Sequence, residues 1–179
     1  ADLSVISADN EDIFLDNSLS GGAVTAYDDL GAPANVQFRW AKTDNAAGGG
    51  DTWNLFYKTS DSATGATTKW TNVGQDYAFD AQGRLSPAVD ATTVTGMTVN
   101  GIALGNVTLN HGSSNITQYN DENGTVSTNQ LDQSGYPSGE LVSIAVSENG
   151  RVTGTYSNGK TIDLAEISLA RFNAADKLK

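Results

Sequence analysis

The sequence predicts an all-β protein, and three observations lead to this prediction. Apolar and polar residues alternate over many short stretches, as in strands that bury one face. Nineteen glycines stand against three prolines, and Asn, Asp, Ser and Thr are abundant, which is typical of a chain with many turns. The one helical candidate, residues 173–179, is too short to hold a helix without packing.

The clearest strand signal lies between Gly135 and Phe172, where the pattern predicts a three-stranded meander. In its first strand we expect two faces, one with Val142, Ile144 and Val146 and the other with Leu141, Ser143 and Ala145. Turns are predicted at 148–150 and 157–160, and the second contains Asn-Gly, the pair that best tolerates positive φ angles. Alternation changes parity after Leu164, which predicts a β-bulge near Ala165–Glu166.

The earlier part of the chain predicts further strands. Residues 1–22 are interpreted as an extended lead-in with at most one short strand. A hairpin follows, with arms at 22–27 and 35–42, a turn at Asp28-Asp29-Leu30-Gly31, and Val36, Phe38 and Trp40 on one face. Other strands are predicted at 53–57, 69–73 and 77–79, with two or three more between 93 and 109. Polar loops are predicted at 45–50, 59–68 and 111–130.

Composition excludes several classes of protein. The net charge of −11 disfavours nucleic acid and anionic membrane surfaces as partners, because both would repel the chain. No cysteine is present, so neither disulfides nor thiol chemistry can be proposed. No apolar run approaches the length of a transmembrane helix, and no signal peptide opens the chain. Because the chain starts at Ala1 without Met, we expect a fragment or a processed chain.

Candidate catalytic residues are few. His111 is the only histidine, and without a second His or a Cys a solvated loop residue is the favoured interpretation. Three carboxylate pairs could serve as the acid and base of a glycosidase: Glu11-Asp12, Asp28-Asp29 and Asp121-Glu122. Adjacent residues on a strand point to opposite faces and such pairs are common in turns, so solvated turns are favoured.

Candidate binding sites are equally weak. The acidic segment 120–124 lacks the alternating oxygen ligands and distal Glu of an EF-hand loop. Glycosylation sequons begin at Asn106, Asn115 and Asn123, as an Asn- and Thr-rich chain often provides. A sugar platform could use Trp40, Trp53 and Trp70. Strand phase favours core packing for the first two tryptophans and leaves the third evenly balanced. We therefore predict no catalytic, cofactor-binding or metal-binding residue, and no cofactor.

Two blocks of the sequence resemble bacterial flagellar hook proteins, a family of flagellar axial proteins. The first is AVTAYDDLG at 23–31, which is similar to the hairpin that opens the family's outer domain. The second is GYPSGEL at 135–141, followed by a turn ending in Asn149-Gly150, then GTYSNG at 154–159 and LARFN at 169–173. The blocks occur in the family's order and anchor both ends of the chain.

The resemblance implies a central fragment with two parts. Residues 1–130 would form an outer β-barrel or sandwich domain, and 131–179 would form a C-terminal β-meander belonging to a second, inner β domain. The family builds its inner domain from two separated stretches, and only the later one is visible here. We also expect a hinge between the two parts, near residues 128–135, because that segment is polar and lacks alternation.

The function implied is that of a structural subunit, not an enzyme. Hook proteins self-assemble outside the cell into a curved tube, a universal joint of the bacterial flagellum that transmits torque from rod to filament during motility. Partners would be copies of the same protein in a helical tube and other flagellar axial proteins at the tube ends. The fragment itself is expected to be monomeric, since the family's coiled-coil segments are absent from it.

Two other functions stay open on the residues alone. A cell-surface carbohydrate-binding or adhesin β-sandwich would share the acidity and the turns, and exposed coplanar aromatic rings would favour it. A glycosidase-like enzyme would require two carboxylates facing each other across a cleft.

Overall fold

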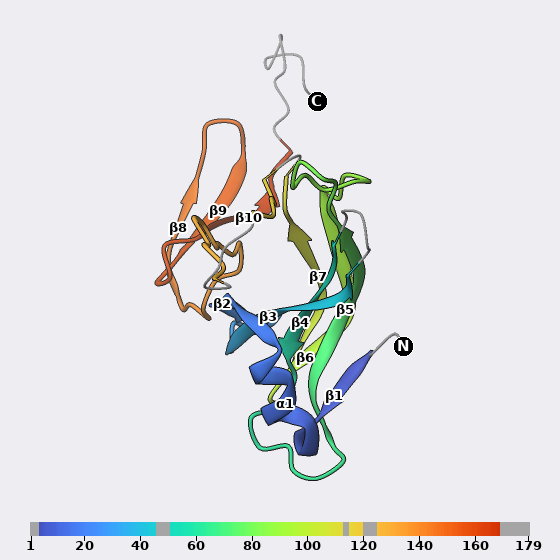
Figure 1. The fold of residues 1–179 in the computed structure, drawn as a ribbon. Helices are drawn as coiled ribbons and strands as arrows, with labels where there is room; N and C mark the ends of the chain where they lie inside the picture. Colours follow the sequence, from blue (N-terminus) through green and yellow to red (C-terminus); the bar gives the residue numbers. More distant parts are fainter. Residues whose placement is uncertain (1–3, 46–50, 113–114, 120–124, 169–179) are drawn as a thin grey trace, which may run out of the picture. The chain divides into compact units, whose positions relative to one another are not determined.

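The computed structural model describes residues 4–45, 51–112, 115–119 and 125–168 (Figure 1). The chain divides into two compact units, Ala1–Gly135 (unit 1) and Tyr136–Lys179 (unit 2). The described residues of both units form antiparallel strands, so the all-β prediction is confirmed. No helix in the described ranges is long and apolar enough to cross a membrane.

Unit 1 is built on a five-stranded antiparallel sheet with strand order β1-β5-β4-β3-β2. Its strands are β1 (Val5–Ser7), β2 (Ser18–Tyr27), β3 (Pro33–Asn45), β4 (Asp51–Lys58) and β5 (Thr68–Ala78). The predicted β2–β3 hairpin is confirmed, with Gly31 at a φ of 79° in its turn. The two strands predicted at 69–73 and 77–79 are one strand, because Gly74 (φ 82°) lies in a β-bulge and does not end β5.

A two-stranded hairpin, β6 (Ala91–Val99) and β7 (Ile102–Asn110), completes unit 1. The sequence predicted up to three short strands here, separated at Gly96 and Gly105 as well as at Asn100-Gly101. Only the last of these is a turn, with φ angles of 50° and 82°. Gly96 and Gly105 lie at β-bulges inside two nine-residue strands, with φ angles of 64° and 70°.

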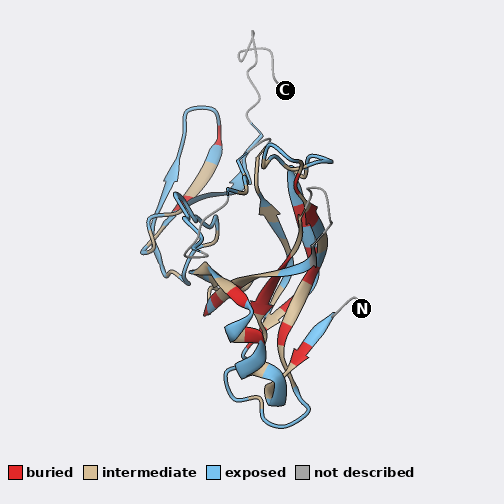
Figure 2. Cartoon of the chain, in the orientation of Figure 1, coloured by how far each residue is buried: buried red, intermediate tan, exposed pale blue. Residues whose placement is uncertain are grey.

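The main core of unit 1 lies between the β6–β7 hairpin and one face of the five-stranded sheet (Figure 2). Val36 and Phe38 are buried there and Trp40 packs beside them, which confirms the predicted face of β3. The hairpin contributes three buried residues, Val94, Met97 and Val99. Tyr77 of β5 is fully buried at the centre, with its ring edge-on to Trp40 (4.9 Å between centroids).

The opposite face of the sheet is partly covered by a short helix that the sequence did not predict. A 3-10 turn, η1 (Ala8–Asn10), leads into α1 (Glu11–Asp16). Phe14 of α1 is buried against Phe56 (5.1 Å) and Trp70 (5.4 Å). The predicted extended lead-in is therefore wrong, because a six-residue helix depends on tertiary contacts that sequence periodicity does not reveal.

Unit 2 is a three-stranded sheet with the order β10-β9-β8, formed by β8 (Leu141–Val146), β9 (Arg151–Tyr156) and β10 (Thr161–Glu166). The predicted meander is confirmed, and Gly159 has the positive φ (81°) expected of the tight turn. The predicted bulge in β10 is present, but it lies between Asp163 and Ala165, slightly earlier than expected.

Candidate interaction surface

The segment before β8 is tied to the turn between β9 and β10. Glu140 and Ser157 exchange two hydrogen bonds: the Ser157 main-chain N–H donates to the Glu140 carbonyl (2.8 Å), and the Glu140 N–H donates to the Ser157 hydroxyl (2.9 Å). The Asn158 side chain donates to the Pro137 carbonyl (2.7 Å). These contacts join the GYPSGEL block to the YSNG block in one structure.

Two further contacts complete this junction. A side chain at Gly139 would clash with the Asn158 amide, since a Cβ there would lie 2.7 Å from Asn158 Cγ. The Lys160 ammonium lies 3.4 Å from the centre of the Tyr136 ring, within the range of a cation–π contact. The residues that carry the family resemblance therefore hold the segment before β8 against the turn between β9 and β10.

A second bulge in unit 2 changes which residues share a face. The register shifts between Leu141 and Ser143, so Val142 is the extra residue in β8. Parity changes across it, and Leu141 joins the face of Ile144 and Val146. The prediction that Leu141 shares a face with Ser143 is wrong, because alternation alone cannot locate a bulge.

The result is an apolar sheet face, formed by Leu141, Ile144, Val146, Val152, Ile162 and Leu164. Leu141 and Leu164 reach over Gly154 from the two outer strands, each with a methyl carbon 2.9 Å from where a glycine Cβ would lie. Except for Val152, the side chains of this apolar face are 45–60% exposed. The opposite face is polar, with Ser143, Thr153, Thr155 and the Arg151–Asp163 ion pair (3.0 Å).

Within the described residues of unit 2, nothing covers the apolar face, and β8 and β10 are exposed along their whole length (Figure 2). Contiguous apolar surface of this kind marks interaction sites in soluble proteins. A three-stranded sheet gains independent stability when its apolar face is packed against another element. The apolar face is therefore the candidate functional surface.

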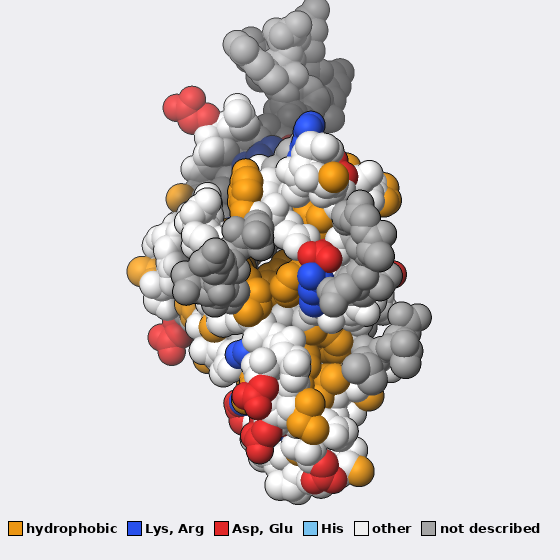
Figure 3. Space-filling model, viewed as in Figure 1, with side chains coloured by type: hydrophobic (Ala, Val, Ile, Leu, Met, Phe, Trp, Pro, Cys, Tyr) orange, Lys and Arg blue, Asp and Glu red, His pale blue; other side chains and the backbone are white. Residues whose placement is uncertain are grey.

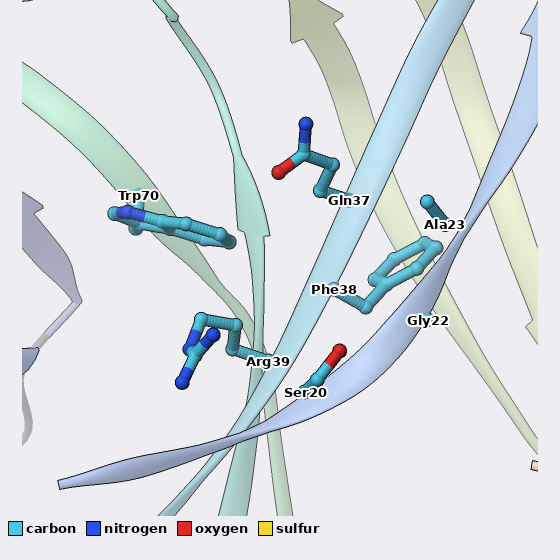
Figure 4. Close-up of a pocket in the computed structure, with 7 residues that line it drawn as sticks. All are labelled: Ser20, Gly22, Ala23, Gln37, Phe38, Arg39 and Trp70. Carbon is cyan, nitrogen blue, oxygen red and sulfur yellow. The ribbon is translucent and has the colours of Figure 1, made fainter. Parts of the chain in front are cut away.

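Unit 1 carries a shallow hollow of about 230 Å³ on its five-stranded sheet (Figure 4). It is lined by Ser20, Gly22, Ala23, Gln37, Phe38, Arg39 and Trp70. The guanidinium of Arg39 is already bound to the Ser18 hydroxyl (2.7 Å) and to the carbonyls of Leu15 (3.0 Å) and Ser18 (2.6 Å). The basic side chain that lines the hollow is thus already used in holding the fold together.

His111 is not the solvated loop residue that the sequence favoured. Its Nε2 lies 2.8 Å from the hydroxyl of buried Tyr77, and the two rings meet edge to face at 5.3 Å. Burial lowers the pKa of the imidazole. Sequence patterns could not reveal this partner, because Tyr77 lies 34 positions away.

Two of the candidate catalytic carboxylates, Asp28 and Glu11, have structural partners. Asp28 accepts hydrogen bonds from the N–H groups of Leu30 (2.9 Å) and Ala32 (2.7 Å) and so fixes the hairpin turn. Glu11 forms an ion pair with Lys69 (2.6 Å). Asp121-Glu122 and the acidic segment 120–124 lie outside the described residues. No group of His, Asp and Glu in the described ranges could hold a metal ion.

All three tryptophans pack into the protein, as predicted for Trp40 and Trp53, and Trp70, for which the sequence favoured neither interpretation, is buried too. Trp70 is 3% exposed, Trp40 lies against Tyr77, and Trp53 packs at the edge of the main core. Of the sequons, Asn106 accepts a hydrogen bond from the Gly96 N–H at the bulge (3.1 Å), Asn115 is exposed, and Asn123 lies outside the described residues. The three packed tryptophans therefore provide no sugar platform.

Comparison with known proteins agrees with the resemblance. The family model of the flagellar basal body protein FlaE D2 domain matches residues 16–136, more than half of the chain. Over 151 residues the chain is 32% identical to the flagellar hook protein FlgE of Salmonella typhimurium and of Salmonella typhi, and 28% identical to that of Escherichia coli. The match covers 84% of this chain and 34% of each relative, so the chain spans about a third of their length. The chain belongs to the family of flagellar proteins that contain the FlaE D2 domain, and its relatives are flagellar hook proteins.

Proposed function

We propose that this chain is part of a structural subunit of the bacterial flagellar hook. The family match and the hook-protein relatives support this role, which places the protein outside the cell and gives it no catalytic task. Its partners are then copies of the same subunit in a helical tube, with other axial proteins at the tube ends.

The two units correspond to two domains of such a subunit. The sequence predicted a boundary between 130 and 131, but the family match spans 16–136, so we assign 1–135 to an outer β domain and 136–179 to part of an inner β domain. Residues 131–135 pack on unit 1: Leu131 lies close to Gly22 and Gly135 lies close to Tyr27. We therefore place the flexible joint at the Gly135–Tyr136 bond, at the end of the segment in which the sequence predicted a hinge.

The apolar face of unit 2 is the observation that carries this proposal. A sheet with one apolar and one polar face needs a second layer over the apolar side. The relatives are about three times as long as the matched part, and 34% of their length is covered. We assign the cover to another segment of the same long subunit, which would complete the inner domain.

The tube would then work as a universal joint. Inner domains hold the lattice through packed apolar surface, whereas outer domains shift against one another as the curved tube rotates. A surface with a net charge of −11 and polar turns suits contacts that are made and broken repeatedly, because such contacts are weak and hydrated.

Substitutions on the two faces of unit 2 test this assignment in the full-length subunit. Ile144→Asp places a charge on the apolar face, and Thr155→Asp places the same charge on the polar face of the neighbouring strand. We expect Ile144→Asp to abolish hooks in electron micrographs and swimming in soft agar, and Thr155→Asp to leave both intact. Normal hooks with Ile144→Asp would show that the apolar face is not covered in the assembled subunit.

The alternative of a carbohydrate-binding or adhesin sandwich is not favoured. Its requirement is exposed coplanar aromatic rings, and the three tryptophans are packed into the two cores of unit 1. The relatives are hook proteins.

A further inference from the structure

Asn-Gly pairs form three of the turns between described strands: Asn100-Gly101 joins β6 to β7, Asn149-Gly150 joins β8 to β9, and Asn158-Gly159 joins β9 to β10. A fourth pair, Asn123-Gly124, lies outside the described residues. Asparagine is a thermolabile residue, and it reacts most readily before glycine, which has no Cβ to hinder attack by its own nitrogen. The surroundings of each turn decide how easily its asparagine reacts.

The reaction is an intramolecular substitution at the asparagine side chain. The main-chain nitrogen of the next residue, deprotonated by hydroxide, attacks Cγ, and the side-chain nitrogen takes a proton from water and leaves as ammonia. Water then opens the cyclic imide. Opening at the side-chain carbonyl yields aspartate, and opening at the main-chain carbonyl yields isoaspartate. Asparagine and water thus become an acid and ammonia, and Cγ must be free to turn toward the next nitrogen.

Two of the turns form a matched pair, because their main chains are held in the same way. The Gly150 N–H donates to the Ser147 carbonyl (2.9 Å), and the Gly159 N–H donates to the Tyr156 carbonyl (3.0 Å). A second main-chain hydrogen bond closes each turn, at 2.9 and 2.8 Å. The two glycines have φ angles of 78° and 81°. The attacking nitrogen is therefore bound alike in both turns.

The asparagine side chains of this matched pair differ. Asn158 is held at both ends: its Nδ2 donates to the Pro137 carbonyl (2.7 Å), and its Oδ1 accepts from the Lys160 N–H (3.0 Å). Asn149 is exposed, and its side-chain amide has no hydrogen bond to any described residue. Turning Cγ toward the next nitrogen therefore breaks two hydrogen bonds at Asn158 and none at Asn149.

Asn100 is held as firmly as Asn158, by a different partner. Its Oδ1 accepts from the Asp61 N–H (2.7 Å), and its Nδ2 donates to Asp61 Oδ2 (2.6 Å). Lys58 pairs with the same carboxylate (2.8 Å), which fixes the partner in turn. The β6–β7 turn is thus protected by side-chain contacts, as the β9–β10 turn is.

A contact on the other side of the β8–β9 turn slows the reaction at Asn149. Gly150 is buried, and its carbonyl accepts a hydrogen bond from the Ile167 N–H (2.7 Å), just beyond β10. Hydroxide reaches the Gly150 nitrogen only when the turn opens. Ile167 is half exposed and lies past the end of its strand, where local opening costs least. This contact does not hold the asparagine side chain, but it links the turn to the end of β10.

We propose that Asn149 is a site of spontaneous modification, at which asparagine converts to aspartate and isoaspartate while Asn100 and Asn158 keep their amides. Either product adds a negative charge, and isoaspartate also lengthens the main chain of the turn by one carbon. We expect the altered turn to lose the hydrogen bond between Gly150 and Ile167, so that the modification loosens the end of β10. The inference does not depend on the proposed function, because every group in it belongs to this chain.

NMR of the intact 179-residue chain measures the conversion, because each asparagine side-chain amide gives its own pair of signals, which disappears on reaction. At mildly alkaline pH we expect the Asn149 pair to disappear at least about tenfold faster than the Asn100 and Asn158 pairs, whose hydrogen bonds must break first. In urea, where the turns are unfolded, the three rates should become similar. Equal rates in the folded chain, or faster loss at Asn158, would overturn the proposal.

The products and their effect are followed in the same samples. Fragment masses should show NH₂ replaced by OH at Asn149, and chromatography separates the aspartyl from the isoaspartyl peptide. Hydrogen exchange at the Ile167 amide should become faster as the product accumulates. Asn149→Gln keeps an amide but would require a larger, six-membered imide, so neither change should occur in this variant over the same period. Loosening of Ile167 in Asn149→Gln would contradict its link to the modification.

Gly139→Ala tests the role of the side-chain contacts. The added Cβ would lie 2.7 Å from Asn158 Cγ and so displaces that amide, and Gly139 is not among the glycines with positive φ. We expect Asn158 then to react at nearly the rate of Asn149, and Asn149 to react as in the wild type. An unchanged rate at Asn158, or an equal rise at both positions, would show that these contacts do not set the rates, and the proposal would fail.

Discussion

Arg39 on β3 donates a hydrogen bond from its guanidinium to the main-chain carbonyl of Leu15 in α1 (3.0 Å). The last carbonyl groups of a helix have no partner inside the helix. Burying them without another hydrogen-bond donor would destabilise a helix as short as α1. Arg39 also binds the carbonyl and hydroxyl of Ser18, so one side chain fixes the whole exit from α1. The helix is therefore stabilised by the sheet that it covers.

Replacing Arg39 should expose this dependence. Arg39→Met keeps an apolar stem but removes every donor, and we expect it to lower the free energy of unfolding by about 1–3 kcal/mol. Arg39→Lys keeps the charge but lacks the planar guanidinium, so its free energy of unfolding should lie between those of the wild type and Arg39→Met. The urea midpoint measures both, and a wild-type midpoint for Arg39→Met would show that the carbonyls find other partners.

Gly83 has no room for a side chain. A Cβ there would run into the main-chain carbonyl of Gln118, and its φ is 72°. We expect Gly83→Ala to cost more than about 2 kcal/mol, the sum of left-handed strain and displaced backbone. Gly65→Ala is the matched control, since Gly65 has a φ of 60° and nothing within 4 Å. Thermal melting that shifts equally in the two variants would contradict the role of the Gln118 contact.

The turn between β9 and β10 allows a prediction about unit 2. Gly159 has a φ of 81° and open space around it, so the penalty of a substitution is purely conformational. Gly159→Val should cost more than about 1 kcal/mol, because a β-branched residue is strained at positive φ. A denaturant midpoint that does not change, followed by a probe in unit 2, would refute this.

Acid should weaken the attachment of α1, at the end of unit 1 where acidic side chains gather in Figure 3. Burial opposes the charge on Glu11, but hydrogen bonds from Lys69 and Trp70 outweigh it and lower the pKa of the carboxyl. The unfolded chain therefore binds this proton more tightly, and the stabilisation present above the usual Glu range is lost as the pH falls through the lower folded value. Urea midpoints of the wild type and of Glu11→Gln, measured between pH 7 and 3, would reveal this loss of stability. The difference between them should shrink in acid, and a constant difference would contradict the assignment.

The 179-residue chain should be monomeric at micromolar concentration. Its net charge of −11 repels copies, and a single face of three six-residue strands is small beside the surface that stable complexes bury. Sedimentation equilibrium at physiological salt is the measurement. A stable dimer that Ile144→Asp dissolves would show that the apolar face pairs with its own copy.

Much of the strand pattern follows from the sequence, because alternation reports burial directly. Val36 and Phe38 are buried, as period two requires, and the Asn158-Gly159 turn lies where its chemistry placed it. The bulges at Gly74 and Val142 could not be placed, since a bulge is defined by the register of the partner strand.

The apolar face of unit 2 could be predicted only in part from the alternation of residues. Alternation located Ile144 and Val146 on one face, but Leu141 joins them through the bulge that the sequence did not show. The partner of His111 was missed for a similar reason: side-chain pairs far apart in the chain have no local signature. Helix α1 was missed because Arg39 and Trp70, which hold it, lie on distant strands.

The fit between Gly139 and Asn158 has a consequence for how these sequences change over time. The Asn158 amide occupies the volume that any larger residue at 139 would need, and it also holds the Pro137 carbonyl (2.7 Å). A larger residue at 139 is then tolerated only with a different residue at 158, which in turn releases Pro137. We expect the two blocks to be inherited as a pair, so that relatives lacking one of them lack both. An alignment of many hook proteins in which positions 139 and 158 vary independently would contradict this coupling.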